Sequence, residues 1–360
     1  ARIKTPEQLW YGQDVPAGTL ALRTALLPLS WVYGGAARAH RALYSSGLLD
    51  AHRAKVPVVA VGNVVAGGAG KTPVVMLLCR LALDAGLKVA VLSRGYGVPI
   101  ADEGVVVSSG SGPLVSAEVC GDEPLLIARQ VPQALVLAGP NRVRLAARAV
   151  DELGAQLLIL DDGMQHHRLF HNALVAVARV PAPLGNGHLL PAGPLREPAN
   201  ALRAAHTVVL LGEGAADLPV ATERLLRARL EPTRLTALDG TPQPLESLRG
   251  IRVVAAAGIG RPHALADTLR LVGATVLELH ALADHAALDD AALTRLVHRA
   301  GSVGAHALVI TEKDVIKLTA VPPPAFPVWA LGVDLAFRDD GGVARLRTLL
   351  LELAAGRVVS

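Results

Sequence analysis

An apolar run, a glycine-rich turn and an apolar helical stretch follow one another directly in residues 56–86. VPVVAV (56–61) is typical of a buried strand, and the run from Thr72 to Gly86 is typical of a helix that the glycine ends. The turn AGGAGKT (66–72) predicts backbone N–H groups that point toward one anion, because glycines allow close approach and a helix N-terminus attracts negative charge. This succession favours a phosphate-binding loop.

The side chains at the end of this turn fit a nucleoside triphosphate. A lysine such as Lys71 reaches the β and γ phosphates, and a hydroxyl such as that of Thr72 binds Mg²⁺. The strict pattern GxxxxGK(S/T) requires a glycine where this chain has Val65, so a structural glycine turn stays open as the alternative. We expect the nucleotide to lie on Val65, Ala66, Gly67, Gly68, Ala69, Gly70, Lys71 and Thr72.

Short apolar runs and helical stretches continue to alternate after this turn. KVAVLS (88–93), QALVLA (133–138) and QLLILDD (156–162) are predicted strands separated by helical stretches. Only 18% of the residues are charged and ten are aromatic, so the core must be built from Ala, Leu and Val. That composition suits helices packed on a buried parallel sheet, and the predicted fold class is α/β.

The length of 360 residues, at roughly 150 residues per domain, predicts one large or two ordinary domains. A second series of predicted strands and helices begins at Ile251, after a predicted strand and a less regular connector at 206–250. We therefore expect an N-terminal segment (1–50), a nucleotide-binding core (51–245) and a smaller C-terminal α/β domain (246–360).

Two carboxylates stand at the end of one predicted strand. LLILDDGMQHH (157–167) ends its strand with Asp161 and Asp162, and phosphoryl transfer needs such groups near its metal, beside the phosphate loop. Adjacent carboxylates also occur in turns and helix caps, so this pair indicates a metal site only in combination with the phosphate loop. Gln165 and His166 follow on the same rim of the sheet, although an isolated His pair is more often a surface or core feature.

Three further motifs carry candidate groups. GDEP (121–124) places Asp122 and Glu123 at a predicted helix start, where a helix cap with a first-turn glutamate is the more ordinary explanation. SRGYG (93–97) lies at the carboxyl end of a strand, the edge at which open α/β sheets bind ligands. ADHA (283–286) follows a strand of the second series, and a single histidine there is by itself more often structural than catalytic.

Charge and cysteine content exclude other classes of function. A net charge of +4 over 360 residues is a weak field, so no nucleic-acid partner is predicted. Cys79 and Cys120 have no CxxC or paired-histidine spacing, which predicts neither a disulfide framework nor a zinc site and favours a reducing compartment. ARIKTPEQLW, the first ten residues, leads into no short apolar core with a cleavage site, so no cleavable signal is expected.

An uncharged stretch of 14 residues, TALLPLSWVYGGAA, lies between Arg23 and Arg38. It is too short to span the roughly 30 Å of hydrocarbon in a bilayer. Trp31 and Tyr33, followed by Arg38 and Arg41, are typical of a helix that lies in the membrane interface. A helix packed on the domain is the alternative.

Several strings, in their order and combination, resemble the tetraacyldisaccharide 4′-kinase family, the lipid A 4′-kinases, over most of the chain. They are VGNVVAGGAGKTP (61–73), LSRGYG (92–97), GDEP (121–124), ILDDGMQHHRL (159–169), GNGHLLPAGPLREP (185–198), AGIGRP (257–262), ADHA (283–286) and TEKD (311–314). The string at 185–198 is not expected in generic nucleotide-binding proteins. In this family the first glycine of the strict loop pattern is commonly absent, as it is at Val65.

The resemblance implies a P-loop NTPase-like sheet with a second, smaller α/β domain and an N-terminal membrane-interface helix. It implies ATP and Mg²⁺ as cofactors, and transfer of the γ-phosphate to the 4′-hydroxyl of tetraacyldisaccharide 1-phosphate. The product is lipid IVA, in the biosynthesis of lipid A and lipopolysaccharide. Such a lipid substrate implies a peripheral protein on the cytoplasmic face of the bacterial inner membrane, and no protein partner is evident from the sequence.

The resemblance also implies roles for single residues. Lys71 contacts the phosphates, and the metal contacts are Thr72, Asp161, Asp162 and Glu123. Asp122 matches the proposed general base, with His285 as its partner, because an aspartate with an ordinary pKa near 4 is a poor proton acceptor from an alcohol. Candidate contacts to the acceptor are Tyr96, Arg94, Gln165, His166 and Arg196, the last as a bidentate partner of the anionic 1-phosphate.

A rival from another class is a P-loop ATPase switch or partner-binding ATPase of the GGxGKT type, which transfers nothing to a small molecule. Such ATPases typically carry a lysine at the first position of their loop, where this chain has Ala66. A soluble small-molecule kinase is a third possibility, and it would leave the Trp31 segment and the loop PAGPLREP (191–198) unexplained.

Overall fold

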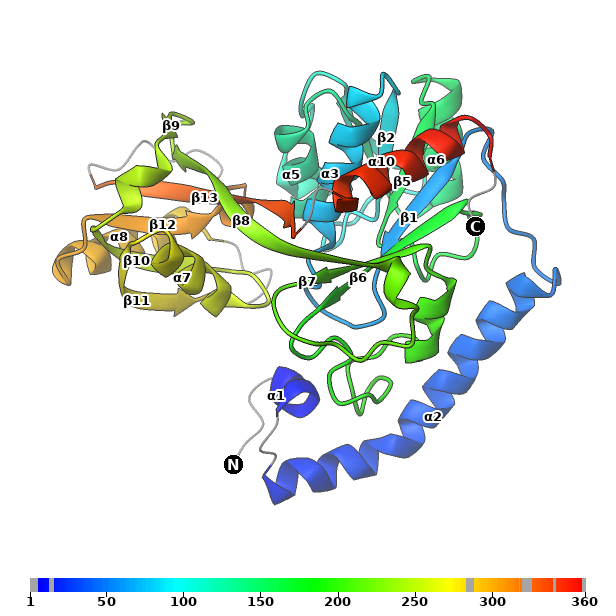
Figure 1. Cartoon of the computed structure of the whole chain (residues 1–360). Helices are drawn as coiled ribbons and strands as arrows, with labels where there is room; N and C mark the ends of the chain where they lie inside the picture. The colour runs from blue at the N-terminus through cyan, green and yellow to red at the C-terminus, as the bar shows by residue number, and fades with distance from the viewer. Residues whose placement is uncertain are drawn as a thin grey trace. The chain divides into compact units, whose positions relative to one another are not determined.

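The computed structural model describes residues 6–12, 16–282, 288–316, 318, 326–338 and 341–357. The contacts divide the chain into two compact units (Figure 1). Unit 1 comprises Ala1–Arg94, Asn141–Arg229 and Phe337–Ser360, and unit 2 comprises Gly95–Pro140 and Leu230–Ala336. The domain limits predicted at residues 50 and 245 divide the chain along its sequence, whereas the units combine separate stretches, so those limits stay a prediction.

Unit 1 is built on a parallel sheet in the order β8–β7–β6–β1–β5–β2. Its strands are β1 (Val58–Gly62), β2 (Val89–Ser93), β5 (Leu157–Asp161), β6 (Ala173–Arg179), β7 (Thr207–Leu211) and the first part of β8 (Leu225–Ala237). Val61 lies opposite Asp161 and Gly62 opposite Ala176, so the carboxyl ends of the central strands share one edge. The predicted parallel α/β sheet is confirmed.

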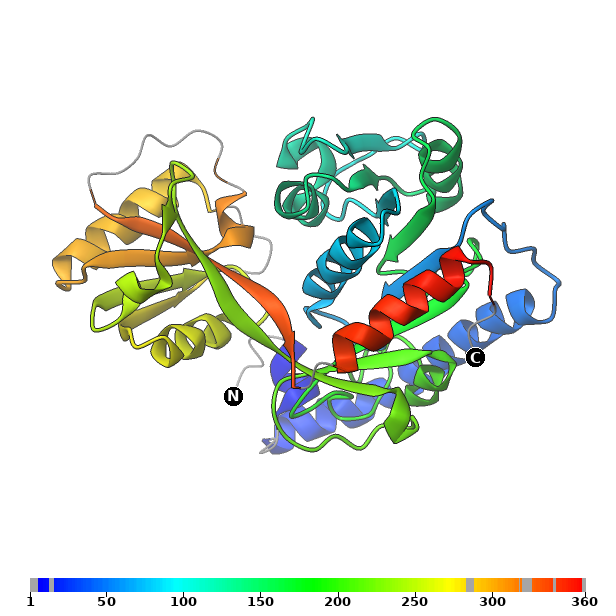
Figure 2. The ribbon, with the colours of Figure 1, turned by 45° about the horizontal axis from the view of Figure 1, so that its top comes forward.

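Helices α3 (Lys71–Asp84), α6 (Arg142–Asp151) and α10 (Gly341–Ala354) pack around this sheet. Leu78 and Cys79 belong to the buried face of α3, which contacts β1, β2 and β5. Helix α10, red in Figure 2, packs against α3. Unit 1 also contains two short 3-10 turns, η1 (Ala199–Ala204) and η2 (Thr222–Arg224). The helix that follows the β1–α3 loop is therefore buried against the centre of the sheet.

The N-terminal part of unit 1 is helical, with α1 (Pro6–Tyr11) followed by the 29-residue helix α2 (Ala17–Ser45). The predicted N-terminal helix is thus present, and Pro28 lies inside it. Its buried residues are small, namely Thr19, Ser30 and Gly34. Within the described part of the chain, no helix combines the length and apolar character needed to cross a bilayer.

Unit 2 contains the second α/β series that the sequence predicts. Its parallel strands run in the order β11–β10–β12–β13, next to β8. The elements are β3 (Val105–Ser109), α4 (Ala117–Cys120), α5 (Asp122–Gln130), β4 (Leu135–Ala138), β9 (Pro242–Gln243), η3 (Leu245–Leu248), β10 (Arg252–Ala257), α7 (Pro262–Leu271), β11 (Thr275–Ala281), α8 (Asp290–Ser302), β12 (Ala307–Thr311), α9 (Glu312–Val315) and β13 (Val328–Phe337). Apolar clusters around Leu269 and Leu293 form its core.

Two features of these strands differ from the expectation. The predicted strand at 133–138 is β4, but β3, which the sequence did not indicate, pairs with it antiparallel. The strand expected within 206–250 is β7, but the connector expected there contains the 13-residue strand β8, which begins in unit 1 and continues into unit 2. Long strand pairing therefore replaces an irregular linker in this part of the chain.

Candidate active site

The predicted phosphate loop, residues 66–72, joins β1 to α3. Gly67 and Gly70 have φ angles of +97° and +84°, in the left-handed region that favours glycine. A Cβ atom at Gly70 would lie 2.5 Å from Leu211 Cδ1, so a side chain there would require Leu211 to shift in addition to the backbone strain. At Gly67 and Gly68 a Cβ would meet no described atom within 4 Å. Open space therefore lies along the glycines next to the N-terminus of α3, as triphosphate oxygens require.

A second segment of the chain holds the start of this loop. The N–H of Arg196 donates to the Val64 carbonyl oxygen at 2.7 Å, and the N–H of Ala66 donates to the Pro194 carbonyl oxygen at 2.7 Å. Val65 lies between these bonds in an antiparallel bridge and is 8% exposed. A valine therefore fits where the strict pattern has glycine, because its side chain packs inward and its backbone is bridged.

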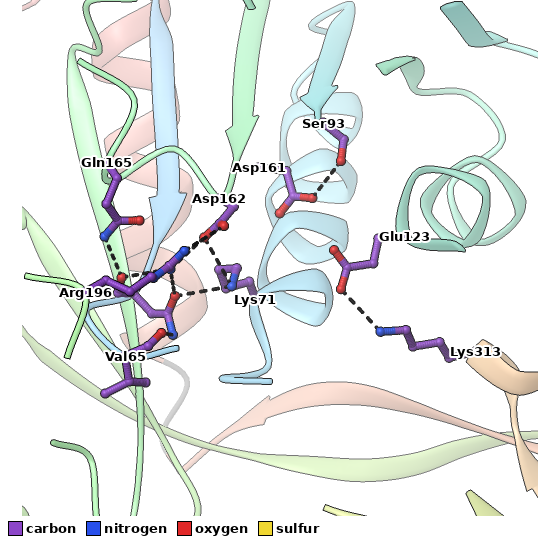
Figure 3. A network of polar contacts seen from close by, with 10 residues as sticks. Val65, Lys71, Ser93, Glu123, Asp161, Asp162, Gln165, Arg196 and Lys313 are labelled. Carbon is purple, nitrogen blue, oxygen red and sulfur yellow. Dashed lines mark hydrogen bonds and ion pairs between the residues drawn. The ribbon is translucent and has the colours of Figure 1, made fainter. Parts of the chain in front are cut away.

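Four side chains meet beside the loop (Figure 3). The Lys71 ammonium lies 3.2 Å from Asp162 Oδ1 and donates to Asn63 Oδ1 at 3.2 Å. Arg196 donates to both carboxylate oxygens of Asp162 at 2.9 Å each, and to the Asn63 carbonyl oxygen at 3.1 Å. It also bonds Asn63 Oδ1. One carboxylate thus faces two cations, and the excess positive charge suits a phosphate ligand.

Asp162 occupies an unusual backbone conformation directly after β5. Its φ of +52° lies in the left-handed region, which is costly for a residue other than glycine and is often found at functional sites. Burial alone would raise the pKa of Asp162, but hydrogen bonds from Arg196 and the charge of Lys71 outweigh it and hold the pKa well below its ordinary value. Asp162 is therefore an anion throughout the physiological pH range.

The predicted metal ligands of unit 1 are oxygen donors on two adjacent elements. Asp161 ends β5, is 2% exposed and accepts a hydrogen bond from Ser93 Oγ at 3.1 Å. Thr72 is the second residue of α3. Among the described residues, no group of three or more His, Cys, Asp or Glu side chains forms a metal site. Mg²⁺ commonly takes one or two carboxylates together with phosphate oxygens and waters, so the donor set has the chemistry that this ion prefers.

Gln165 and His166 lie on the turn after Asp162. Gln165 Nε2 donates to the Asn63 carbonyl oxygen at 2.9 Å and so joins the network. Burial, together with the charges of nearby arginines including Arg142 and Arg94, lowers the pKa of His166 to about 4. His166 is therefore a neutral imidazole at pH 7. The structure thus places Gln165 and Arg196 around Asn63, while Arg94 is exposed.

The remaining predicted site residues belong to unit 2 or lie outside the described residues. Asp122 and Glu123 open helix α5, and Glu123 Oε1 lies 3.4 Å from the ammonium of Lys313. Tyr96 is 67% exposed. His285 is outside the described residues. Because the phosphate loop belongs to unit 1, the roles predicted for these residues at that loop stay predictions.

Sequence reasoning did not single out Asn63, which contacts Lys71, Arg196 and Gln165. Its place directly after a predicted strand, at the edge where α/β sheets bind ligands, is the signal that would have identified it. Ser93, the partner of Asp161, stands at the end of another predicted strand and carries the same signal.

Comparisons with known proteins agree on one family. The chain matches the family model described as tetraacyldisaccharide-1-P 4′-kinase over residues 22–351. A tetraacyldisaccharide 4′-kinase from an Anaeromyxobacter species is 43% identical over 368 residues, with 98% of each chain covered. Another, from Geobacter sulfurreducens, is 36% identical over 327 residues, covering 90% of this chain and 92% of the relative. Among solved structures, the "apo" form of LpxK from Aquifex aeolicus in complex with ATP is similar with a TM-score of 0.74 and 30% identity, covering 91% of this chain and 99% of that one.

Proposed function

The chain belongs to the tetraacyldisaccharide-1-P 4′-kinase family, and from that premise we propose that its site transfers the γ-phosphate of ATP to the 4′-hydroxyl of tetraacyldisaccharide 1-phosphate. The product is lipid IVA, in lipid A biosynthesis. The contact between Lys71 and Asp162 carries the proposal. A cation at the phosphate loop beside a carboxylate at a strand end is the arrangement that phosphoryl transfer from a nucleotide requires.

The loop and Lys71 hold the triphosphate. The N–H groups of residues 67–72 donate to phosphate oxygens, and the Lys71 ammonium exchanges Asp162 for the β and γ phosphates. That exchange places the ammonium where charge is spread in the loose transition state. Arg196 stays on Asp162 and keeps this carboxylate oriented and anionic.

Thr72, Asp161 and Asp162 are the proposed Mg²⁺ contacts of unit 1, with Glu123 as a further one. Mg²⁺, when bound, neutralises charge on the phosphate oxygens. Ser93 orients Asp161, and Arg196 orients Asp162. Each carboxylate thus has its own neighbour that fixes its direction, which lowers the cost of organising the site during the reaction.

Asp122 is the proposed general base for the 4′-hydroxyl, with His285 as its partner. A histidine can orient a carboxylate and raise its basicity toward that of an effective proton acceptor. The loose transition state asks little of a base, so positioning and charge neutralisation supply most of the rate. Asp122 should therefore contribute less than Lys71.

The proposed acceptor contacts are Tyr96, Arg94, Gln165, His166 and Arg196. The guanidinium of Arg196 already makes a bidentate contact with Asp162, whereas Arg94 is exposed. Arg94 is therefore the better candidate for the 1-phosphate. His166, as a neutral imidazole, can donate or accept a hydrogen bond with a sugar hydroxyl.

Four acyl chains keep the acceptor in a bilayer, so we propose that α2 docks the protein on a membrane surface, the cytoplasmic face of the bacterial inner membrane. Leu29, Trp31 and Val32 on α2 are 57%, 70% and 72% exposed, while Ser30 and Gly34 are buried. A surface helix ordinarily buries its large apolar side chains, and α2 does the opposite. Exposed apolar residues of this kind favour insertion into the lipid interface.

Product analysis tests the proposed reaction. Purified protein is incubated with Mg-ATP and tetraacyldisaccharide 1-phosphate in detergent micelles, and the lipid is analysed by mass spectrometry. We expect a lipid that has gained one phosphate, and no such product with the Lys71→Ala protein. ATP turnover without phosphorylated lipid would favour the ATPase switch and contradict the kinase proposal.

A further inference from the structure

Helix α2 turns its small and polar side chains toward one loop of unit 1, residues 189–196. Ser30, which is 3% exposed, donates to the Leu189 carbonyl oxygen at 2.9 Å and accepts from the Ala192 N–H at 3.0 Å. At Gly34, one turn later, a Cβ atom would lie 2.5 Å from Leu189 Cδ1. A larger residue at this point would therefore require the Leu189 side chain to shift.

Two more side chains of α2 hold the end of this loop and the residue that follows it. The Tyr33 hydroxyl donates to the Arg196 carbonyl oxygen at 3.0 Å. Arg41 forms an ion pair with Glu197, which is 5% exposed. Helix α2 thus contacts the loop near its beginning and again at its end.

From this loop the contacts continue to the nucleotide site. Arg196, whose carbonyl oxygen Tyr33 holds, donates its N–H to the Val64 carbonyl oxygen at 2.7 Å. Its guanidinium donates to Asp162 at 2.9 Å, and Asp162 lies 3.2 Å from the Lys71 ammonium. A displacement of Arg196 therefore moves the start of the phosphate loop and the carboxylate that faces Lys71.

We propose that Ser30 and Tyr33 are positioning residues for phosphoryl transfer, which act by fixing the loop 189–196 and thereby the place of Arg196. The proposal rests on the kinase function proposed above and adds to membrane docking. In this proposal the outer face of α2 meets lipid. Its inner face fixes the loop 189–196, which in turn contacts the nucleotide site. A shift of about 1 Å in a reacting group can cost roughly 10²-fold in rate, so two hydrogen bonds away from the chemistry are sufficient to matter.

Simple anchoring is the competing explanation of the same contacts. If Ser30 and Tyr33 only keep α2 on the protein, their loss changes thermal stability or vesicle binding and leaves kcat unchanged in the folded protein. If they position Arg196, their loss lowers kcat and weakens nucleotide binding while vesicle binding stays constant. The two explanations therefore differ in kcat and in nucleotide affinity.

The test uses the full chain with Tyr33→Phe, Ser30→Ala and the double substitution. Tyr33→Phe removes one oxygen from a side chain that is 36% exposed and keeps the ring, so the fold is retained. We expect kcat to fall about 3- to 10-fold in each single variant, as loss of one hydrogen bond implies, and about 10- to 100-fold in the double variant. The Kd of a fluorescent ATP analogue, measured without lipid, should rise, and recovery with anionic phospholipid vesicles should match the wild type.

Two matched controls remove hydrogen bonds that stay within α2. Thr24 Oγ1 donates to Leu20 at 3.0 Å, and Ser45 Oγ donates to Ala42 at 3.2 Å. Thr24→Ala and Ser45→Ala should keep wild-type kcat and nucleotide affinity.

Wild-type kcat and nucleotide affinity in the double variant, or an equal loss in the controls, would overturn the positioning role. If the unaltered chain transfers no phosphate to lipid, the proposed function fails instead. The nucleotide affinities of the same variants, measured without lipid, then still decide whether α2 positions the loop.

Discussion

The Lys71 ammonium and the Asp162 carboxylate lie 3.2 Å apart, so under the proposed function the lysine must exchange this carboxylate for phosphate oxygens when nucleotide binds. Arg196 is the second cation on Asp162, and we expect it to stabilise the carboxylate during that exchange. The phosphate loop, the end of β5 and the loop 189–196 are thereby linked through one carboxylate.

Removing the ammonium of Lys71 should abolish transfer. Lys71→Met keeps most of the side-chain length, and we expect the rate to fall by roughly 10³-fold or more because preorganised charge is the largest catalytic contribution. Initial rates of lipid phosphorylation measure this loss. Lys88→Met, at an exposed lysine just before β2, is the control and should keep the wild-type rate. Undiminished transfer by the Lys71→Met protein would contradict the assignment.

Neutralising Asp162 should strengthen nucleotide binding without Mg²⁺ and lower the rate of phosphoryl transfer with Mg²⁺. In Asp162→Asn, Lys71 and Arg196 lose their shared anion, so a fluorescent ATP analogue should bind several-fold more tightly in the presence of a chelator. With Mg²⁺ present the rate should fall, because a carboxylate contact to the metal is missing. Weaker binding of the analogue in the chelator would show that Asp162 does not compete with phosphate for Lys71.

Asp122 and His285 should contribute less to the rate than Lys71 and should act as one unit. General bases typically supply roughly 10²- to 10⁴-fold, so we expect Asp122→Asn to lower kcat by about 10²-fold. His285→Ala should lower it less, and the double variant should resemble Asp122→Asn because the two losses are not additive. Multiplicative losses in this double-mutant cycle would indicate that the two residues act independently.

Stability should fall as the solution becomes mildly acidic. Burial is the main cause that lowers the pKa values of His166 and His167 to about 4, from an ordinary value near 6.5. Between these values the unfolded chain takes up protons that the folded chain does not, so the free energy of unfolding decreases as pH falls. The urea midpoint should therefore be lower at pH 5 than at pH 7, and His167→Gln should reduce the difference. The pKa of Asp162 is also lowered, so this residue adds to the loss of stability only below about pH 4, where an ordinary aspartate takes up a proton.

Membrane docking should depend on the exposed apolar residues of α2. The side chains of Trp31 and Val32 are 70% and 72% exposed, so Trp31→Ser with Val32→Asn should lower recovery with anionic vesicles and change the melting temperature little. Leu271→Asn changes an equally apolar residue, 85% exposed on α7, and serves as the control. Point substitutions are preferable to deletion of residues 1–45, because α2 also holds the loop 189–196. Equal vesicle recovery of both proteins would remove the docking role.

Local patterns were sufficient to predict the centre of the site. AGGAGKT stands between an apolar strand and an apolar helix, and the pair Asp161–Asp162 ends a strand, so both signals are contained in short stretches of sequence. Parallel strands bring their carboxyl ends to one edge, which is why the two stretches could be placed together before β1 and β5 were seen to be neighbours.

Contacts that depend on the path of a long loop could not be predicted in the same way. Arg196 and Asp162 are 34 residues apart, and only the course of residues 183–198 brings them together. The sequence suggested the acceptor phosphate as the partner of Arg196, whereas its guanidinium binds Asp162 in the structure. Strand β8 was missed for a different reason. Pro232 and neighbouring polar residues are unusual within a long strand, so the local pattern did not indicate one.

A crystal structure with Mg²⁺ and a non-hydrolysable ATP analogue tests the central claim most directly. We predict that the β and γ phosphates accept hydrogen bonds from backbone N–H groups of the loop 67–72, and that Lys71 Nζ has moved from Asp162 to the phosphates. Triphosphate density away from this loop, with Lys71 still bound to Asp162, would contradict it.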